Sequence, residues 1–493
     1  MADQNITFDV EYDLVVIGGG GSGKSAALTG AQAGLRVALL EKRAETGGTS
    51  AHAEGMAAFE SSEQKARVAP EEPGKHYPTR EEGYRRFTEY SHYRANPDVV
   101  RMLVDNSAET IDIMKSLGIV YTDVTIYAYD QPLEVYSFHR PDGLGARVQE
   151  LLLRACVNAG VDIFTSTPAR QILMEDGAVI GVQAQDSKGN VMNIGAKAVI
   201  LASGGYGNNL EIMKKHSWLS KSIDYIYQAV PAENMGDGLS MALEAGADTE
   251  SLGTLMFTYC ARPKTLSSHV NGAGSQPGLW VNKSGRRFAS EEVGMSFSNA
   301  AVNVGKQPEG LVYVIIDDNT ISHLMEEGSD VGRGDFIVYH MKLDRLQAEL
   351  DQDVAEGIVW KGETITELAQ AIGIDPAVLA ATVDEYNQAC DQGYDPLFFK
   401  PAKYLRPVRK GPFYAIHMAP GVVVSCGGIR VNGNLQVTDK DYRPIPGLYA
   451  VGNDASGLYG DTYNLDVPGA ANGFAHTSGR VAARHAIQTI KGE

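Results

Sequence analysis

Apolar and polar positions alternate at the start of the chain in a way that predicts two strands and a helix. Residues 12–17 (YDLVVI) form a short apolar run typical of a buried strand. Residues 24–34 are rich in alanine and end at Gly34, which predicts a helix and its stop. The run at residues 35–40 (LRVALL) predicts the next strand. Strand, glycine turn, helix and strand in this order indicate an α/β fold.

Related patterns recur further along the chain. Residues 198–207 (AVILASGGYG) and 447–454 (GLYAVGND) each predict a strand that runs into glycine. Between them, residues 376–393 place Leu379, Val383, Tyr386 and Cys390 on one helical stripe, with Asp375 as N-cap and Gly393 as stop. We expect that stripe to belong to a core.

The segment after the first βαβ unit is predicted in less detail. Asn96-Pro97 opens a helix, and Ser107 is expected to cap a second helix that Gly118 ends. Residues 61–94 are polar and irregular, so we expect an exposed excursion without regular structure.

The glycine turn after the first strand fits two motifs. Gly18, Gly20 and Gly23 spell the dinucleotide fingerprint G-x-G-x-x-G, whereas Gly18, Gly23, Lys24 and Ser25 spell the nucleotide-triphosphate loop G-x-x-x-x-G-K-S. Glu41 ends the second strand, where a carboxylate accepts hydrogen bonds from an adenosine ribose. We therefore favour the dinucleotide interpretation, with Lys24 as a solvated or phosphate-near side chain. A P-loop NTPase, with residues 311–318 (LVYVIIDD) as its magnesium strand, is the weaker alternative.

A second loop of small residues indicates that the expected ligand is longer than the glycine turn alone would bind. Residues 46–56 (TGGTSAHAEGM) follow Glu41 and would let backbone N–H groups approach a pyrophosphate or a flavin ring. Together with the two later strands that end at glycine, this loop indicates a ligand as long as FAD.

Composition excludes several classes of partner. The chain has 493 residues, enough for two domains, and a formal net charge of −18, which opposes binding to nucleic acid. No apolar run is long enough to span a membrane. The four cysteines lie far apart, without the spacing of a metal site or of a disulfide framework. We expect a cytoplasmic protein without a metal centre.

Motifs along nearly the whole chain resemble one flavoprotein family. They are Gly236-Asp237-Gly238, Val281–Phe288 (VNKSGRRF), Gly411–Ala415 (GPFYA) and Ile445–Tyr449 (IPGLY). The family includes fumarate reductases, the succinate dehydrogenase flavoprotein, urocanate reductases, 3-ketosteroid dehydrogenases and ring reductases of anaerobes such as tetrahydrodaidzein reductase. The resemblance implies a Rossmann-like FAD-binding domain built from residues 1–252 and 412–493, with an α+β capping domain inserted at residues 253–411.

The resemblance also implies where FAD binds. Thr49 stands where covalent members carry a histidine, so we expect non-covalent FAD, and Asn453 stands where relatives commonly carry a glutamate. Gly469, Ala470 and Ala471 open the last helix, whose N-terminus would face the flavin pyrimidine. The expected FAD-binding residues are Gly18, Gly20, Gly23, Glu41, Lys42, Gly48, Thr49, Ser50, Gly55, Ala169, Ala202, Gly204, Gly452, Asn453, Gly469, Ala470 and Ala471.

Three positions depart from the dicarboxylate-reducing members. Met295 stands in place of the arginine that follows the motif R-F-x-x-E, and Val422–Val424 stand in place of a histidine. Residues 463–469 (YNLDVPG) lack the substrate-binding arginine. Because these cations hold a dianion in the relatives, a fumarate-like substrate is the less favoured alternative.

Tyrosines are plentiful where the resemblance places the substrate pocket: Tyr127, Tyr129, Tyr136, Tyr259, Tyr459 and Tyr463. A phenol offers an apolar face and a hydroxyl that donates or accepts a proton. We expect hydride transfer between flavin N5 and a C=C or CH–CH bond of a neutral, steroid- or isoflavonoid-like ring substrate. Tyr463, Tyr259 and Glu292 are the candidate proton carriers, and a redox partner or NAD(P)H the expected electron donor.

Overall fold

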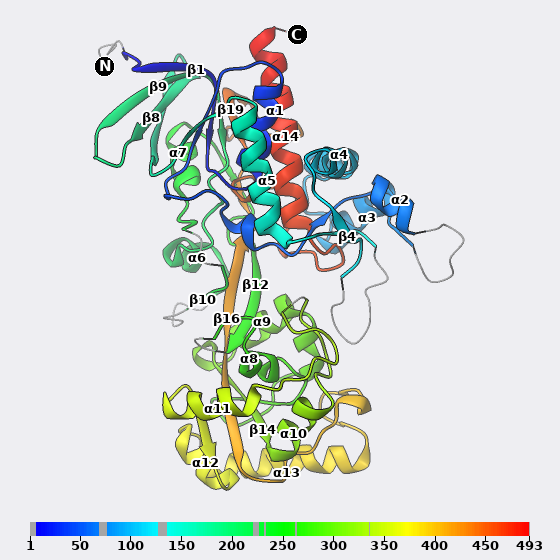
Figure 1. Cartoon of the computed structure of the whole chain (residues 1–493). Helices are drawn as coiled ribbons and strands as arrows, with labels where there is room; N and C mark the ends of the chain where they lie inside the picture. Colours follow the sequence, from blue (N-terminus) through cyan, green and yellow to red (C-terminus); the bar gives the residue numbers. More distant parts are fainter. Residues whose placement is uncertain are drawn as a thin grey trace.

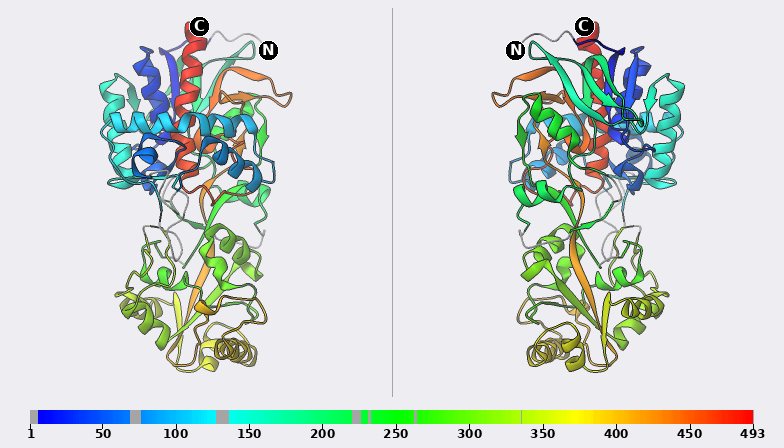
Figure 2. Two further views of the ribbon diagram at one scale, coloured as in Figure 1. Left: turned by 90° about the vertical axis from the view of Figure 1, so that its right-hand side faces the viewer. Right: turned by 90° about the vertical axis from the view of Figure 1, so that its left-hand side faces the viewer.

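The chain forms two lobes stacked along one long axis (Figures 1 and 2). The computed structural model describes residues 6–68, 76–126, 136–219, 226–230, 233–261, 264–334 and 336–492. One lobe contains both ends of the chain, and the other is formed by the middle of the sequence. This arrangement confirms the expected fold class, an α/β domain made from both chain ends with an inserted cap.

A largely parallel sheet forms the centre of the first lobe. Its strand order is β19-β9-β1-β2-β6, and each neighbouring pair among these five is parallel. Leu14, Val15 and Val16 of β1 are fully buried because both faces of the sheet are covered. The strands are β1 (Val10–Ile17), β2 (Val37–Leu40), β6 (Asp162–Phe164), β9 (Val191–Leu201) and β19 (Pro444–Ala450), extended by the antiparallel β7 (Ala169–Glu175), β8 (Ala178–Gln185) and β18 (Gln436–Thr438).

Two helices from opposite ends of the sequence pack together on this sheet. They are α1 (Gly21–Gln32) and α14 (Ala470–Lys491), which lie side by side in Figure 1. A methyl group on Gly479 of α14 would lie 2.1 Å from the carbonyl oxygen of Ser22, so the backbones approach as closely as glycine allows. The remaining elements of this lobe are η1 (Thr49–His52), β3 (Met56–Ala57), α2 (Ser62–Arg67), α3 (Arg80–Tyr90), α4 (Pro97–Ser116), β4 (Tyr121–Asp123), β5 (Phe138–Pro141), α5 (Leu144–Asn158), α6 (Leu210–His216), α7 (Asp237–Glu244), β11 (Thr249–Glu250), β17 (Gly428–Ile429) and η5 (Gly452–Asp454).

The second lobe is built around the long strand β16 (Phe413–Ser425), which runs from this lobe back to the first (Figure 1). β16 is antiparallel to β12 (Leu255–Ala261), β14 (Val312–Asp317) and β15 (Val359–Gly362). A domain division at residue 411 therefore separates β16 from strands to which it is hydrogen-bonded. The other elements of this sheet and lobe are β10 (Tyr227–Gln228), α8 (His269–Gly274), β13 (Leu279–Asn282), η2 (Glu291–Met295), α9 (Phe297–Gly305), η3 (Pro308–Gly310), α10 (Asp318–Glu326), α11 (Leu346–Ala355), α12 (Ile365–Ala371), α13 (Pro376–Gln392) and η4 (Ala402–Tyr404).

A buried cluster of charges joins separate segments of the cap. Arg287 donates from Nε to Glu291 Oε1 at 2.8 Å and from a terminal nitrogen to Asp395 Oδ2 at 2.7 Å. Lys400 Nζ lies 3.4 Å from Glu291 Oε2. All four side chains are at least nine-tenths buried, so each charge depends on its partners for the solvation that water would supply.

Two expectations about local structure were wrong. Ser107 does not cap a helix, because α4 continues from Pro97 to Ser116 and the buried Ser107 hydroxyl accepts the backbone N–H of Phe59. The stretch around residues 61–94 holds two helices, α2 and α3, each with a capping box, Ser61 with Gln64 and Thr79 with Glu82. The helix at residues 376–392 with Asp375 as N-cap is confirmed.

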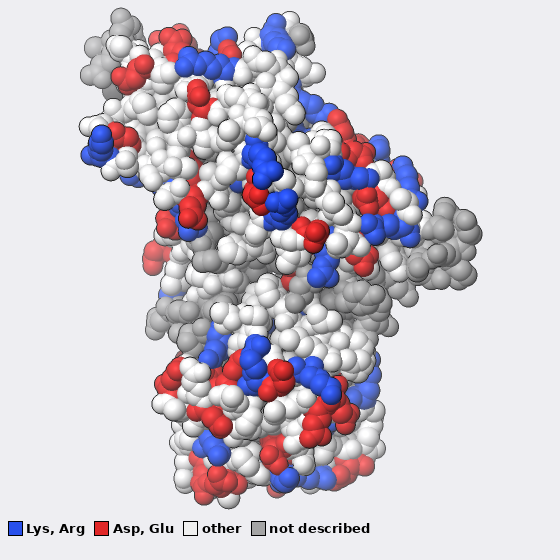
Figure 3. Space-filling view, in the orientation of Figure 1, with Lys and Arg blue, Asp and Glu red and all other residues white. Residues whose placement is uncertain are grey.

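The surface carries mixed charges (Figure 3), and the cysteines are reduced. Within the described residues, no helix is long and apolar enough to cross a membrane. The face seen in Figure 3 mixes Lys and Arg with Asp and Glu over both lobes. All four cysteines are free thiols, and three of them are buried.

Candidate functional site

A groove lies at the carboxyl ends of β1, β2 and β9. In an open parallel sheet, this edge is where ligands bind. The groove is lined by the glycine turn, the end of β2, η1 with its preceding glycine, the start of β7, the turn after β9, and residues next to α7 and α14. Segments from both ends of the chain therefore meet around one elongated space.

The glycine turn is shaped by close backbone approaches. Gly18 has φ +114°, and a methyl group there would lie 2.2 Å from the carbonyl oxygen of Ala202. A methyl group on Gly23 would lie 1.9 Å from the carbonyl oxygen of Gly18. A methyl group on Gly20, in contrast, would meet no protein atom closer than 3.9 Å, because Gly20 faces the groove. These are the separate roles of the three glycines in a dinucleotide fingerprint.

Lys24 does not face the groove, and its expected position near solvent or phosphate is wrong. The side chain is 1% exposed, and Nζ donates to the backbone oxygen of Gln149 at 3.2 Å and to Gln149 Oε1 at 3.1 Å. Burial lowers the pKa of Lys24 to about 8. A nucleotide-triphosphate loop needs this lysine on the phosphates, so the structure contradicts the P-loop alternative.

Glu41 forms hydrogen bonds with the backbone of two segments that line the groove, the glycine turn and the residues after β2. Its Oε2 accepts the N–H of Gly19 and its Oε1 accepts the N–H of Arg43, both at 2.9 Å. The carboxylate is 8% exposed and lines the groove. Glu41 is thus held where an adenosine ribose would lie, with lone pairs left for its hydroxyls.

The wall opposite the turn comes from residues 233–237. Asn234 Nδ2 donates to Thr49 Oγ1 at 2.9 Å, which ties this wall to the loop around η1. Lys42 Nζ forms an ion pair with Asp237 Oδ2 at 2.8 Å. Because Lys42, Glu233, Asn234 and Asp237 all line the groove, these contacts join its two sides.

Asp454 holds the turn after β9 in place. Its Oδ1 accepts the N–H of Gly205 at 2.9 Å and the hydroxyl of Ser203 at 3.0 Å, and its Oδ2 accepts the N–H of Ser203. Burial raises the pKa of Asp454 to about 6. The neighbouring Asn453 lines the groove, so Asp454 positions both Ser203 and Asn453.

A buried histidine provides an unpaired nitrogen next to the groove. His476 Nδ1 shares a 2.9 Å hydrogen bond with Ser25 Oγ, whereas Nε2 has no partner within the described structure. A methyl group on Gly21 would lie 2.6 Å from Ser50 Oγ and 2.8 Å from His476 Nε2, so both side chains meet at the start of α1. Burial lowers the pKa of His476 to about 3 and keeps the ring neutral. Unpaired polar atoms, helix N–H groups and a glycine cradle together fit an adenine dinucleotide.

The expected FAD-binding residues fall into two groups. Those that line the groove are Gly18, Gly20, Glu41, Lys42, Gly48, Thr49, Ser50, Ala169, Ala202, Gly204 and Asn453. Gly23, Gly55, Gly452, Gly469, Ala470 and Ala471 do not line it. Of these, Gly23 packs α1 on the turn. The carbonyl oxygen of Gly55 accepts from Asn472 of α14 at 3.1 Å, and that of Gly469 accepts the N–H of Ala57 of β3 at 3.0 Å. Thr49 has no ring nitrogen with which to form a histidyl bond to flavin.

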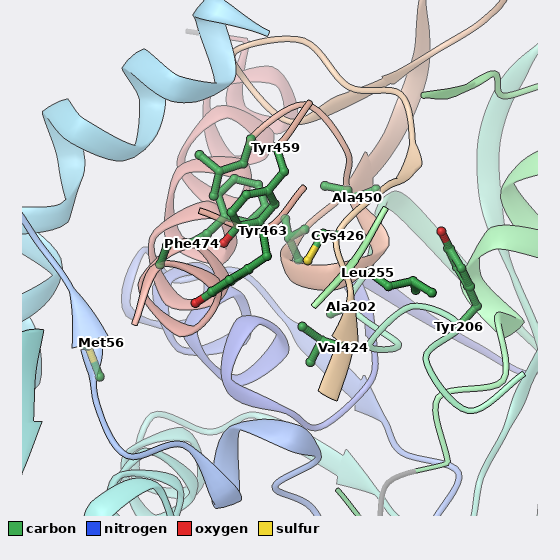
Figure 4. Packing of buried hydrophobic residues seen from close by; sticks show 14 of the residues in the cluster. Met56, Ala202, Tyr206, Leu255, Val424, Cys426, Ala450, Tyr459, Tyr463 and Phe474 are labelled. Atoms are coloured by element: carbon green, nitrogen blue, oxygen red, sulfur yellow. The ribbon is translucent and has the colours of Figure 1, made fainter. Parts of the chain in front are cut away.

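Two tyrosines lie together at the N-terminus of α14. The rings of Tyr459 and Tyr463 are 5.2 Å apart, and Figure 4 shows them against Phe474 and near Cys426. Tyr463 is 3% exposed. Burial raises the pKa of Tyr463, with smaller increases from Cys426 and Tyr90, while a hydrogen bond from the Ala471 backbone N–H opposes them. The phenol is therefore protonated at neutral pH.

The other two candidate proton carriers lie in the cap. Tyr259 of β12 is fully buried, with its hydroxyl 3.1 Å from the carbonyl oxygens of Ser275 and Gly294, and burial raises its pKa to about 12. Glu292 of η2 is half-buried, and the hydroxyl of Ser290 donates to it at 3.3 Å. Among the described residues, no hydrogen bond joins either residue to Tyr463. Tyr127 and Tyr129 lie outside the described residues.

The positions that differ from dicarboxylate reductases hold no cationic side chain. The sulfur of Met295 accepts the hydroxyl of Tyr404 at 3.5 Å. Val424 of β16 is 3% exposed and packs beside Leu255 and Cys426 (Figure 4). The loop from Tyr463 to Gly469 carries Asn464, whose amide donates to the carbonyl oxygen of Arg86 at 3.0 Å.

Sequence reasoning missed several residues that organise the groove. Asn234 and His476 carry no motif, because their roles depend on contacts with Thr49 and Ser25 from distant parts of the chain. Asp454 and Asp237 lie within the sequence motifs given above. Asp454 follows a strand and Asp237 begins helix α7, and a carboxylate at such a position was a readable sign that it accepts backbone N–H groups.

Comparisons with known proteins agree with this geometry. A model of the FAD binding domain family matches residues 13–466. The chain is 36% identical to vinyl phenol reductase of Lactiplantibacillus plantarum, over 97% of this chain and 96% of that protein. It is 28% identical to the fumarate reductase (cytochrome) of Shewanella frigidimarina, over 97% of this chain and 77% of that protein.

A solved structure shows the same fold. The 3-ketosteroid delta1-dehydrogenase from Sterolibacterium denitrificans superposes with a TM-score of 0.80 at 20% identity, covering 97% of this chain and all of that one. The family match spans nearly the whole chain and falls on the residues that line the groove. The chain therefore belongs to the FAD-binding flavoprotein family of the fumarate reductases and vinyl phenol reductase, whose members are FAD-dependent oxidoreductases acting on C=C or CH–CH bonds.

Proposed function

We propose that this protein reduces a C=C bond conjugated to a neutral, hydroxylated ring, with a vinylphenol as the model substrate. The observation that carries the proposal is the 36% identity to vinyl phenol reductase over almost the full length of both chains. Steroid-like and isoflavonoid-like rings belong to the same chemical class, since they pair an apolar ring system with an oxygen substituent.

The lack of a cationic side chain at the three departing positions supports a neutral substrate. Met295, Val424 and the loop at residues 463–469 provide no cation where dicarboxylate-reducing relatives carry one. A dianion placed against these groups would lose its hydration without gaining an ion pair. A vinylphenol instead buries an apolar ring, which the aromatic faces of Tyr459 and Tyr463 suit.

Tyr463 is the residue that we propose as proton donor. The reduction adds one hydride and one proton across the C=C bond, and FAD, once bound and reduced, supplies the hydride. Tyr463 is protonated at neutral pH, and the positive end of α14 stabilises the phenolate left after proton transfer. Protonation of Tyr463 from solvent restores the starting state.

The electron source and the compartment are part of the proposal. The described structure has no second nucleotide-binding lobe, so we propose that a redox partner or transiently bound NAD(P)H reduces the flavin. Four free thiols are typical of a reducing compartment, which favours the cytoplasm.

Steady-state reduction with a chemical electron donor tests the proposal. The purified FAD-loaded protein should convert para-vinylphenol to para-ethylphenol and should leave fumarate unreduced. Tyr463→Phe should lower turnover by at least about 100-fold, the contribution of a general acid, with FAD content unchanged. Reduction of fumarate in preference to vinylphenol would assign the chain to the dicarboxylate reductases, and full activity of Tyr463→Phe would place the acid elsewhere.

A further inference from the structure

The hydroxyl of Tyr459 is buried without a hydrogen-bond partner among the described residues. The residue is 4% exposed, and its ring packs on Tyr463 and on the edge of Phe87 at 6.3 Å. Other buried tyrosines pair their hydroxyls: Tyr206 accepts the N–H of Gly253 at 2.9 Å and Tyr386 accepts from Lys400 Nζ at 2.9 Å. An unpaired phenol leaves its desolvation uncompensated, so Tyr459 requires an explanation that packing does not give.

The surroundings of Tyr459 identify where its hydroxyl acts. The backbone N–H of Ala471, in the first turn of the 22-residue helix α14, lowers the pKa of the neighbouring phenol of Tyr463. The N-cap residue of that helix is Gly469, and no side chain caps it. Cys426, the residue after β16, lies close enough to raise the pKa of both phenols. The unpaired hydroxyl is thus next to the proposed proton donor, at the positive end of the helix that borders the cofactor groove.

We propose that Tyr459 is a specificity-determining residue whose hydroxyl forms a hydrogen bond with the ring oxygen of a phenolic substrate. This inference rests on the proposed function of the same site. A phenolic oxygen both donates and accepts, so it pairs with the Tyr459 hydroxyl whichever of the two carries the shared proton. The Tyr463 ring, tilted by 36° to the Tyr459 ring, then lies beside the conjugated C=C bond while Tyr459 holds the oxygen.

Selectivity for hydroxylated rings follows from this pairing. A site that leaves a buried hydroxyl unpaired favours a ligand that pairs with it over one that cannot. The protein should therefore bind para-ethylphenol about 10- to 100-fold more tightly than ethylbenzene, which has the same apolar shape without the oxygen.

Binding of these two product analogues to the FAD-loaded protein tests the inference without turnover. Titrations followed by the flavin absorbance spectrum should show that Tyr459→Phe weakens para-ethylphenol about 10- to 100-fold and leaves ethylbenzene unchanged. In turnover, Tyr463→Phe should lose activity on para-vinylphenol while it still binds para-ethylphenol as tightly as the wild type.

Thermal unfolding of the ligand-free variants supplies a second readout. Tyr459→Phe removes an unpaired hydroxyl, so its Tm should equal or exceed that of the wild type. The matched control Tyr206→Phe removes a paired hydroxyl and should lower Tm. A Tm loss in Tyr459→Phe equal to that in the control would reveal a structural partner and overturn the inference.

Failure of the inference is separable from failure of the proposed function. If the wild type reduces para-vinylphenol and Tyr459→Phe binds para-ethylphenol as tightly as the wild type, the role of Tyr459 is refuted and the proposed function stands. If the wild type neither binds para-ethylphenol nor reduces para-vinylphenol, the proposed function is refuted and the role of Tyr459 with it.

Discussion

Replacing Gly20 with alanine separates the cofactor groove from the stability of the fold. Gly20 has φ −78° and ψ −168°, an extended conformation open to any residue. The added methyl group would meet no protein atom closer than 3.9 Å and would project into the groove. The apoprotein should therefore fold normally, with a gain of up to about 1 kcal/mol from the lower entropy of the unfolded chain.

FAD binding should respond in the opposite direction. The second glycine of the fingerprint lets the backbone approach the pyrophosphate, and a methyl group there forces the ligand outward. Steric overpacking of this size costs about 1 to 3 kcal/mol, which corresponds to an affinity loss of about 5- to 150-fold.

Two measurements on the same preparation separate the effect of Gly20→Ala on stability from its effect on FAD binding. Urea unfolding of the apoprotein gives stability, and quenching of FAD fluorescence on binding gives the dissociation constant. The control Gly23→Ala should destabilise the apoprotein itself, because its methyl group would lie 1.9 Å from the carbonyl oxygen of Gly18. Unchanged FAD affinity in Gly20→Ala would mean that FAD does not lie against this turn.

Three further predictions follow from buried charges. Burial lowers the folded-state pKa of Lys24 from 10.5 to about 8, so between these pH values the unfolded chain binds one more proton than the folded chain. The unfolding free energy of the wild type should therefore rise by about 3 kcal/mol from pH 8 to pH 10.5. Lys24→Met should abolish this rise, which urea unfolding at a series of pH values measures. Arg287→Met should lower the stability of the cap by about 3 to 5 kcal/mol, because Glu291 and Asp395 lose their buried partner; the fluorescence of Trp280 and Trp360 reports the unfolding. The control Arg345→Met breaks an exposed ion pair with Glu349 and should change the stability by less than about 1 kcal/mol. Equal losses of stability in the two variants would show that burial does not strengthen the Arg287 pairs. Glu41→Gln should weaken FAD about 10-fold by removing a charged acceptor for the ribose hydroxyls, and an unchanged dissociation constant would show that Glu41 only braces the turn.

The local pattern was enough to predict the first βαβ unit. The apolar runs at residues 12–17 and 35–40 and the alanine-rich segment between them correspond to β1, β2 and α1, with boundaries that differ by up to three residues. Glycines at positions of close backbone approach, such as Gly18 and Gly23, were also legible, because few other residues fit there.

Other features depended on tertiary contacts that a sequence pattern does not contain. Ser107 resembles an N-cap, but its burial against Phe59 lets α4 continue through it. Lys24 fits a phosphate-binding motif, yet packing of α1 against α5 places its ammonium on Gln149. The helices α2 and α3 were overlooked because their polar composition masked two capping boxes, which were readable signals.

Some residues of the candidate site were likewise predictable from local sequence, and others only from the fold. Groove-lining residues adjacent to the glycine motifs were predicted. Only the fold places Asn234 in the groove lining and His476 beside Gly21 at its edge. Tyr463 stood out because it precedes the last helix, but the unpaired hydroxyl of Tyr459 became visible only when its neighbours were known.

The central claim is that FAD bound in this groove delivers electrons to a ring-conjugated C=C bond. Anaerobic mixing of the fully reduced, FAD-loaded protein with one equivalent of para-vinylphenol tests it in a single turnover. Oxidised flavin absorbance should return while one equivalent of para-ethylphenol forms. Flavin that stays reduced with para-vinylphenol but is reoxidised by fumarate would contradict it.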